Sequence, residues 1–267
     1  MTAETPTDLL TNLFTELEGE TLLVDPSPAL LDGLASLDTD VLPETVHALV
    51  QEEPLKDARD DFLTASSLAD HVEADRLSLR VLAGAGETPL VVTADTLYTI
   101  VNNAALEPVA IPADDASVIG DVFGAYNDLF ESAEQFDLRM PGRARALDRL
   151  ETDVGTGTKE DFEAILESVT EVSDDTVDVV SLAILVAARN QALLYDISKW
   201  GEDTGVASKA TFSRTKTNIE DIDLLDTEKV PIDVGRPRLR LLLDDADLTD
   251  ADIEAFADVA EEKLADI

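Results

Sequence analysis

The sequence has no cysteine among its 267 residues and contains two histidines, His47 and His71. The absence of cysteine excludes disulfide bonds, thiolate metal sites and cysteine nucleophiles. The two histidines lack the helical spacing of a ligand pair, so we expect no metal site. The sequence also lacks a phosphate-binding loop, and an enzyme would therefore depend on carboxylate chemistry alone. We expect a protein that is not an enzyme and needs no cofactor.

Long hydrophobic runs and aromatic residues are also scarce. Aromatic residues make up 4% of a chain that is 45% hydrophobic, so the core must be built from Leu, Val, Ile and Ala. The longest acid-free apolar stretch has its unbroken part confined to Leu182–Ala188, which is too short to span a bilayer. No basic, apolar signal region opens the sequence. These absences predict a soluble, cytoplasmic protein without a membrane association.

Positive charge is scarce relative to negative charge. The chain has 19 Lys and Arg against 58 Asp and Glu, a formal net charge of −39. Its apolar content is too high for a disordered chain, and the pattern is typical of folded proteins from extreme halophiles. In molar salt the Debye length falls to about 3 Å, which screens repulsion among surface carboxylates. We therefore expect most acidic residues to serve solvation, and pairs such as Asp244 and Asp245 are weak indications of metal binding.

The length favours two domains, and the first part alternates short apolar runs with helical segments. We predict an α/β sensor-like or dimerisation domain over residues 1–150, with a mostly parallel sheet. A connector over 138–158 would lead to a second domain over 159–267. Helices are expected at 5–17, 26–36, 55–72, 94–103 and 116–136, and strands at 21–25, 45–50, 76–83, 89–93 and 108–112.

The second domain has the pattern of a winged helix-turn-helix. Residues 176–190 are apolar on nearly every side, which predicts a central buried helix. The next helix contains Tyr195, Ile197 and Trp200, and Gly205 is suited to end it. Ser208 is a good N-cap for a further helix, and a hairpin follows in which Val230, Ile232 and Val234 alternate against Leu239 and Leu241.

The segment from Thr204 to Ile219 carries no acidic residue, although it is polar. On a helical wheel Phe212 and Ile219 form its core side. Arginine, asparagine and hydroxyl side chains on the far face can read base edges, and flanking cations can contact phosphates. The predicted DNA-contacting residues of this helix are Lys209, Ser213, Arg214, Lys216, Thr217 and Asn218.

The predicted wing adds Arg236, Arg238 and Arg240, of which Arg236 and Arg238 could reach the DNA backbone or minor groove. Such cations could also form a solvated face paired with neighbouring acids. The local loss of acidic residues favours double-stranded DNA as the partner, because the rest of the surface would repel it. A winged helix that contacts another protein remains the alternative.

In the first domain, a ligand would lie at the carboxyl ends of parallel strands. This predicts an effector site that includes Asp25, Ser27 and Thr93, near the 84–86 glycine turn, although these residues could simply be loop caps. Arg143 and Arg145 could meet a phosphorylated effector, DNA or a subunit interface. The last helix, with Ile253 and Phe256 on one stripe, could fold back onto its own domain or pair in a homodimer.

The segment "DISKWGEDTGVASKATFSRTKTNIEDIDLL" resembles the helix-turn-helix of TrmB-like archaeal regulators. With "LLVDPSPALLDGL" and "PLVVTADTLYTIVNN", the whole chain is similar to haloarchaeal regulators of the TbsP (TrmB suppressor) type. The DNA-reading domain is C-terminal here, whereas TrmB-like proteins usually carry it first. The resemblance implies a regulator of central carbon metabolism genes that responds to a sugar or sugar phosphate.

Overall fold

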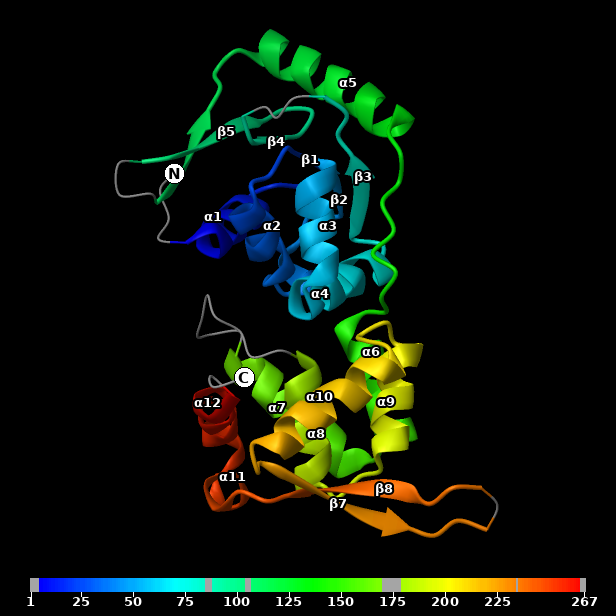
Figure 1. Ribbon diagram of the computed structural model, residues 1–267. Coiled ribbons are helices and arrows are strands. Elements are labelled where there is room, and N and C mark those ends of the chain that lie inside the picture. The colour runs from blue at the N-terminus through cyan, green and yellow to red at the C-terminus, as the bar shows by residue number, and fades with distance from the viewer. Residues whose placement is uncertain (1–4, 85–87, 104–106, 170–178, 234, 265–267) are drawn as a thin grey trace. The chain divides into compact units, whose positions relative to one another are not determined.

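The computed structural model describes residues 5–84, 88–103, 107–169, 179–233 and 235–264. The chain forms two compact units, Met1–Gly142 and Arg143–Ile267, and each is described by itself (Figure 1). Among the described residues, no helix is both long enough and apolar enough to cross a membrane.

The N-terminal unit is built around one sheet with helices on both faces (Figure 1). Its helices are α1 (Pro6–Phe14), α2 (Pro28–Ala35), the 3-10 turn η1 (Thr39–Val41), α3 (Glu52–Asp60), α4 (Phe62–Glu73) and α5 (Ala116–Ser132). Its strands are β1 (Glu20–Val24), β2 (Thr45–Val50), β3 (Leu77–Val81), β4 (Leu90–Val92), β5 (Leu97–Asn102) and β6 (Pro108–Pro112).

The six-stranded sheet is mixed, in the order β3-β2-β1-β4-β5-β6. β1 and β3 run parallel to β2, whereas β4, β5 and β6 continue the sheet through antiparallel pairs. The expectation of a mostly parallel sheet is therefore wrong. Helical crossovers join β1 to β2 and β2 to β3, but the short connection over 82–89 leaves no room for the crossover that a parallel β4 would need.

Residues 97–102 form strand β5, where the sequence pattern predicted a helix. Tyr98, Thr99, Ile100 and Val101 are aromatic or β-branched and favour an extended chain. β5 pairs with β4 on one side and β6 on the other. Beyond the end of β6, the Ala113 amide donates a 2.9 Å hydrogen bond to the carbonyl oxygen of Leu97 in β5. This pairing outweighs the weak helical spacing of the apolar residues.

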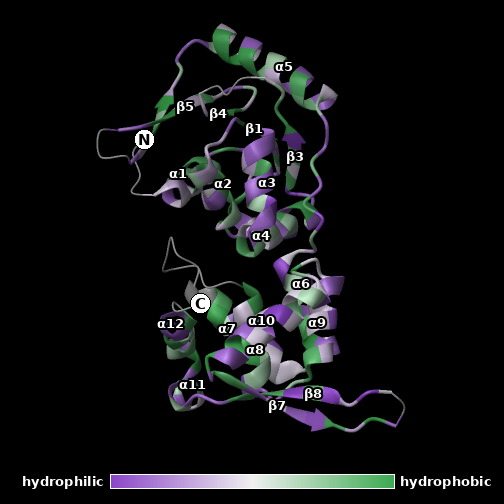
Figure 2. Cartoon of the chain, viewed as in Figure 1, coloured by the Kyte–Doolittle hydropathy of each residue, from purple (hydrophilic) through white to green (hydrophobic). Residues whose placement is uncertain are grey.

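Alternate residues of the sheet build two separate cores. Leu23, Val46 and Leu79 belong to the core shared with α1 to α4, whereas Leu22 and Leu49 belong to a smaller core under α5. Hydrophobic and hydrophilic residues both appear along α5 (Figure 2), and Ile119 and Phe130 are its buried residues. The strand alternation therefore determines which helices cover each face.

The C-terminal end of α5 is held to the sheet by an aromatic and cationic stack. The ring of Phe130 lies parallel to that of His47, with centroids 4.2 Å apart. The Arg80 guanidinium lies 4.5 Å from the Phe130 centroid and donates hydrogen bonds of 2.8 and 2.9 Å to the carbonyl oxygens of Phe130 and Glu131. Arg80 thereby adds donors to the last turn of the helix, where the Phe130 carbonyl also accepts from the Ala133 amide at 3.2 Å.

The C-terminal unit is a helical domain with a β-hairpin. Residues 143–153, inside the expected connector, form a helix because Ala146, Leu147 and Leu150 are buried. The elements are α6 (Arg143–Asp153), α7 (Thr156–Val169), α8 (Val179–Arg189), α9 (Leu194–Asp203), α10 (Lys209–Asp221), β7 (Leu225–Val230), β8 (Arg238–Leu243), α11 (Ala246–Asp250) and α12 (Ile253–Leu264).

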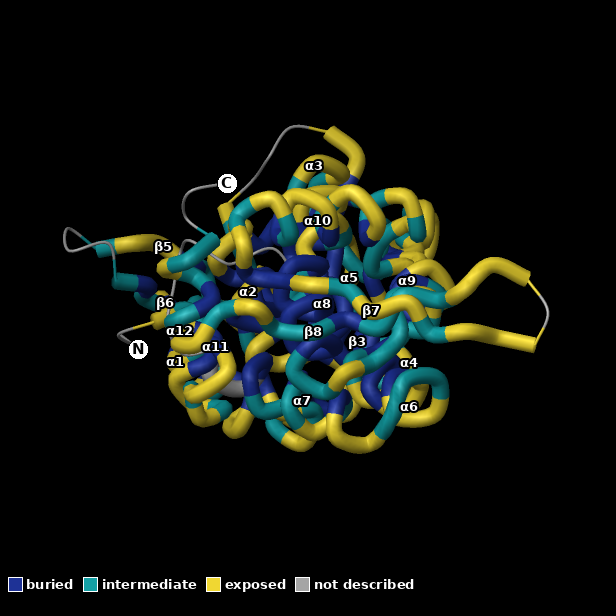
Figure 3. The backbone as a smooth tube through the Cα atoms, turned by 60° about the horizontal axis from the view of Figure 1, so that its bottom comes forward, coloured by how far each residue is buried: buried dark blue, intermediate teal, exposed yellow. Residues whose placement is uncertain are grey.

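Helix α8 is the centre of this unit. Every residue from Val180 to Ala188 is buried, as the dark trace of α8 shows (Figure 3), which confirms the predicted central helix. The final helix packs on α7 and α8, with Phe256 and Ala260 buried. Arg189 lies 5.3 Å from the Phe256 ring centroid and donates a 2.9 Å hydrogen bond to the carbonyl oxygen of Ala251. Of the two alternatives for the last helix, the structure has it folded onto its own unit.

Candidate nucleic-acid interface

Helices α9 and α10 are joined by a tight turn whose geometry follows from its residues. Gly205 has φ +77°, a left-handed conformation that glycine adopts without strain. The Ala207 amide donates to the carbonyl oxygen of Gly201 at 3.3 Å. The Ser208 hydroxyl then accepts a 3.1 Å hydrogen bond from the Thr211 amide and caps α10. The predicted turn and N-cap are both present.

One side of α10 is buried against the domain core. Phe212 and Ile219 are fully buried, as the wheel predicts. Lys216 lies on the same side, with 10% of its side chain exposed, and pairs with Glu220. The Glu220 carboxylate also accepts a 3.2 Å hydrogen bond from the Thr227 hydroxyl of β7. Lys216 therefore points inward, where a DNA phosphate would not reach it, instead of flanking the exposed face.

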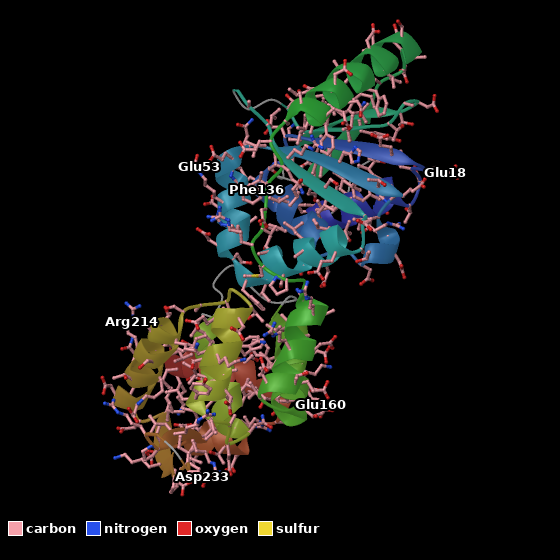
Figure 4. The ribbon with its side chains drawn as sticks, turned by 90° about the vertical axis from the view of Figure 1, so that its right-hand side faces the viewer. Glu18, Glu53, Phe136, Glu160, Arg214 and Asp233 are labelled. Carbon is pink, nitrogen blue, oxygen red and sulfur yellow. The ribbon has the colours of Figure 1, made fainter. Side chains whose placement is uncertain are left out.

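The opposite side of α10 presents Ser213, Arg214, Thr217 and Asn218, all exposed. Arg214 projects away from the body of the unit (Figure 4). The Thr217 hydroxyl donates a 3.0 Å hydrogen bond to the carbonyl oxygen of Ser213, which leaves its acceptor lone pairs toward solvent. Four of the predicted contact residues thus lie together on one helical face.

The β7–β8 hairpin is antiparallel, with Val230 opposite Arg238 and Thr227 opposite Leu241. The predicted alternation continued to Ile232 and Val234, but β7 ends at Val230; Ile232 is 40% exposed beyond the strand, and Val234 lies outside the described residues. Leu241 is fully buried, and its amide donates to the carbonyl oxygen of Ala192 at 2.9 Å. The hairpin is thereby fixed to the start of α9.

The predicted wing cations Arg236 and Arg238 differ in their surroundings. Arg236 is exposed at the end of the hairpin. The Arg238 guanidinium lies 3.9 Å from the ring centroid of Tyr195 and 3.0 Å from the Asp196 carboxylate, both on α9. The sequence pattern groups Tyr195 with the apolar residues of α9, yet Tyr195 is 45% exposed, while Ile197 and Trp200 are fully buried. The helical spacing could have predicted this exposure, because Tyr195 lies about 200° around the helix from the buried Ile197.

A groove of about 410 Å³ lies between the N-terminal ends of α9 and α10 and the hairpin. It touches the exposed face of α10 through Lys209 and Ser213. The sequence alone could not have found this groove, because its residues come from three separate segments. Its lining residues are Leu194, Tyr195, Ser198, Lys209, Ser213, Ile232, Arg236, Pro237, Arg238 and Leu239.

Four of the seven Lys and Arg residues in 208–243 have a carboxylate partner. Lys209 pairs with Glu202, and the hydrogen bond to that carboxylate raises the pKa of the Lys209 ammonium above its ordinary value. Arg240 lies 3.3 Å from Glu228 across the hairpin. Within the described parts of 208–243, ion pairs are absent from Arg214, Arg236 and Lys229. Arg214 and Arg236 are therefore the face's arginines most available to a new anion.

The predicted effector residues of the N-terminal unit do not form one site. Asp25 follows β1 with φ +47°, and the Ser27 hydroxyl caps α2 by accepting from the Leu30 amide at 3.3 Å. Thr93 follows Val92, the last residue of β4, and Val92 pairs with Leu22 of β1. Because β4 runs antiparallel to β1, Thr93 lies near the start of β1, whereas Asp25 follows its end. The grouping is therefore wrong, because it assumed that β4 runs parallel to β1.

Thr93 has a local role instead, since its hydroxyl accepts hydrogen bonds from the amides of Asp95 and Thr96 at 3.3 and 3.1 Å. Arg143 and Arg145 begin α6 and belong to the C-terminal unit. Of the glycine turn at 84–86, Gly84 is described and positions 85–86 lie outside the described residues. Across the described chain, no group of three or more His, Asp or Glu side chains is arranged to hold a metal ion.

Comparisons with known proteins show the family of this chain through two family models. No curated protein matches the sequence. A solved structure of TrmBL2, an archaeal chromatin protein with a novel mode of DNA binding, is 18% identical over 51% of this chain, with a TM-score of 0.36. The chain spans about half the length of that protein, 54%. Two family models match, the TbsP-like N-terminal domain over residues 1–141 and the TbsP-like C-terminal HTH domain over 142–261. The chain belongs to the family of TbsP-like transcriptional regulators, whose C-terminal HTH domain implies DNA binding.

Proposed function

We propose that this chain is a sequence-specific regulator that reads the major groove with α10 and uses the β7–β8 hairpin as a wing. The exposed face of α10 from Ser213 to Asn218 carries the proposal, because residues 204–219 include no acidic residue in a chain of net charge −39, and the exposed Asp221 comes only at the C-terminal end of the helix. A surface that binds DNA needs such relief from negative charge, since the remaining surface repels phosphates. The face lies on the second helix of a capped helix-turn-helix, the element that enters the groove in proteins of this kind.

The residues of this face divide into two roles. Arg214 and Asn218 have the geometry for bidentate pairing with guanine and adenine edges, respectively. Ser213 and Thr217 add hydroxyl groups beside them. Lys209, Arg236 and Arg238 are the proposed phosphate contacts. We leave Lys216 out of the contact set, since its ammonium group is occupied by Glu220 on the inner side of the helix.

We further propose that the protein acts as a homodimer and that the N-terminal unit, residues 1–142, provides dimerisation or sensing. A two-fold dimer would bind a palindromic site with half-sites about one helical turn apart. The resemblance to TbsP regulators supports a halophilic archaeal source and control of central carbon metabolism genes by a sugar-type metabolite. Asp25 and Ser27, at the carboxyl end of β1, are the remaining effector candidates, and thermal-shift measurements with glycolytic intermediates would test them.

Footprinting and immunoprecipitation in molar KCl would test DNA recognition. We expect a few defined sites, and Arg214→Ala should cost about 1–3 kcal/mol at one base position while leaving the fold intact. Lys56→Ala is the matched control, because it removes the same charge from α3 in the other unit. The absence of genomic enrichment, or equal binding by wild type and the Arg214 variant, would contradict the proposal and favour a protein-contacting winged helix.

A further inference from the structure

The strongest unexplained feature of the C-terminal unit is the position of Arg238 between two side chains of α9. Its guanidinium lies 3.9 Å from the Tyr195 ring centroid, and one of its nitrogens is 3.0 Å from an Asp196 oxygen. The side chains of Arg238 and Asp196 are 33% and 29% exposed, so solvent and ligands can reach the pair. Neither contact is needed to anchor β8, because Leu241 is already fixed to Ala192.

The groove beside this pair has the character of an anion site. Its described lining includes Lys209, Arg236 and Arg238 but no acidic residue, although acidic residues outnumber basic ones about threefold in the chain. The Ser213 hydroxyl provides a further hydrogen-bond donor, whereas the Ser198 hydroxyl already donates to the carbonyl oxygen of Tyr195 at 3.1 Å. Asp196 is outside the lining and reaches Arg238 from the side. The groove therefore offers positively charged hydrogen-bond donors to an oxyanion. Two of its three cations, Lys209 and Arg238, already pair with carboxylates from outside the lining.

We propose that a backbone phosphate of DNA enters this groove and replaces Asp196 as the anionic partner of Arg238. The inference rests on the proposed DNA-binding function. Asp196 then acts as a positioning residue that holds Arg238 in place before binding and competes with the phosphate for it. The groove is suited to bind a phosphate group. We assign this phosphate to the DNA backbone because Lys209 and Ser213 line the groove and also belong to α10, the proposed recognition helix.

Tyr195 allows this exchange of partners without loss of position. An arginine presents five N–H donors in one plane, and stacking on a ring uses the face of that plane and leaves the donors free. The Tyr195 ring can therefore hold the guanidinium while its edge passes from the carboxylate to a phosphate. Arg–phosphate pairs are often bidentate, which would fix the hairpin on the DNA backbone.

The exchange predicts an unusual effect of removing a negative charge. With Asp196→Asn the guanidinium loses its internal competitor, so DNA binding should tighten several-fold at low salt. The gain should shrink toward molar KCl, because one additional net phosphate contact steepens the slope of log K against log salt by about 1. The preferred base sequence should stay the same, since phosphate contacts carry no sequence information.

The experiment measures binding of the full chain to a footprinted duplex by fluorescence anisotropy. The KCl series would start at the lowest concentration at which the chain remains folded. Glu228→Gln is the matched control, because it frees Arg240, another arginine of β8 that is outside the groove lining. We expect tighter binding only for Asp196→Asn, weaker binding for Arg238→Ala and Tyr195→Leu, and near wild-type binding for Tyr195→Phe. Equal effects of Asp196→Asn and Glu228→Gln, or no effect of either, would overturn the proposal.

Two further measurements separate the possible failures. If Arg214→Ala still abolishes one base preference while Asp196→Asn is silent, the exchange is wrong and the DNA-binding function stands. If the footprint itself is missing, the proposed function fails as well. Inorganic phosphate tests whether the groove binds a free small anion instead. Phosphate would then stabilise the wild type but not Arg238→Ala, and Asp196→Asn would leave DNA binding unchanged. That result would overturn DNA as the ligand of the groove.

Discussion

Gly201 of α9 lies directly against the ring of Phe212 in α10. A Cβ atom at position 201 would be 2.1 Å from Cε2 of Phe212, far inside van der Waals contact. Both residues are buried, so the ring cannot turn away into solvent. The glycine therefore sets how closely the two helices approach, and with it the orientation of the exposed face of α10.

Gly201→Ala should destabilise the C-terminal unit by about 1–3 kcal/mol, because the added methyl group forces the ring or the helix to move. The better helix propensity of alanine, about 1 kcal/mol, offsets part of this cost. Chemical unfolding in molar KCl, followed by circular dichroism, would measure the change.

Gly124→Ala in α5 is the control for that substitution. A Cβ at Gly124 meets nothing within 4 Å, so this variant should gain up to about 1 kcal/mol from propensity alone. If the two alanine variants were equally stable, the close approach of Gly201 and Phe212 would not limit the packing of α9 on α10.

The sequence predicted those elements whose signals are local. The N-cap Ser208, the left-handed Gly205 and the buried helix α8 all follow from residues within a few positions of one another. Strand β5 was missed because the spacing of its apolar residues also fits a helix. Its β-branched and aromatic residues favour a strand, but the pairing with β4 and β6 that decides its state is not local. The same applies to the direction of β4, and hence to the position of Thr93.

The candidate interface was predicted in part for similar reasons. Arg214 and Asn218 were placed correctly by helical period, whereas Lys216 lies four positions after Phe212 and therefore falls near the core side of the helix. The link between Asp196 and Arg238 joins residues 42 positions apart. Only the folded chain brings α9 beside β8, so the sequence could not reveal the groove or the counter-ion of Arg238.

Substitution of Lys216 should affect stability more than DNA recognition. Lys216→Met keeps the packing of the aliphatic stem and removes the ion pair with Glu220, which is 33% exposed and keeps the hydrogen bond from Thr227. We expect a loss of about 1 kcal/mol or less, since partly exposed pairs contribute little. DNA affinity should stay near the wild-type value when it is measured by anisotropy under conditions in which both proteins are fully folded. A uniform loss of affinity for all sequences would instead indicate that Lys216 contacts phosphates.

The stability of the N-terminal unit should depend on the protonation of His71. Its Nε2 lies 3.2 Å from the carbonyl oxygen of Leu34, which can only accept, so Nε2 carries the proton and donates. Nδ1 then accepts from the Thr39 hydroxyl at 2.9 Å. Burial lowers the pKa of His71 below its ordinary value, despite the raising effects of the Leu34 carbonyl and Asp38.

Because the folded-state pKa is the lower one, the unfolded chain binds a proton first as the pH falls. The free energy of unfolding should therefore be fully maintained above about pH 6.5 and decrease as the pH falls from there toward the lowered pKa. Urea unfolding between pH 7 and 5.5 would measure this slope. His71→Gln should flatten it, whereas His47→Gln, which retains His71, should keep it; identical slopes for wild type and His71→Gln would contradict the assignment.

DNA binding should depend only weakly on salt for so polar an interface. Lys209 and Arg238 exchange a carboxylate for a phosphate, so they release few counterions on binding. Arg236 is the proposed phosphate contact for which the described residues provide no ion pair, and it corresponds to a slope of log K against log KCl of about −1 per subunit, at about −0.9 for each phosphate. Anisotropy titrations across KCl concentrations would give the slope, and Glu202→Gln and Asp196→Asn should each steepen it by about 1. A wild-type slope of about −3 per subunit, the value for three uncompensated phosphate contacts, would show that the carboxylates do not compete with DNA.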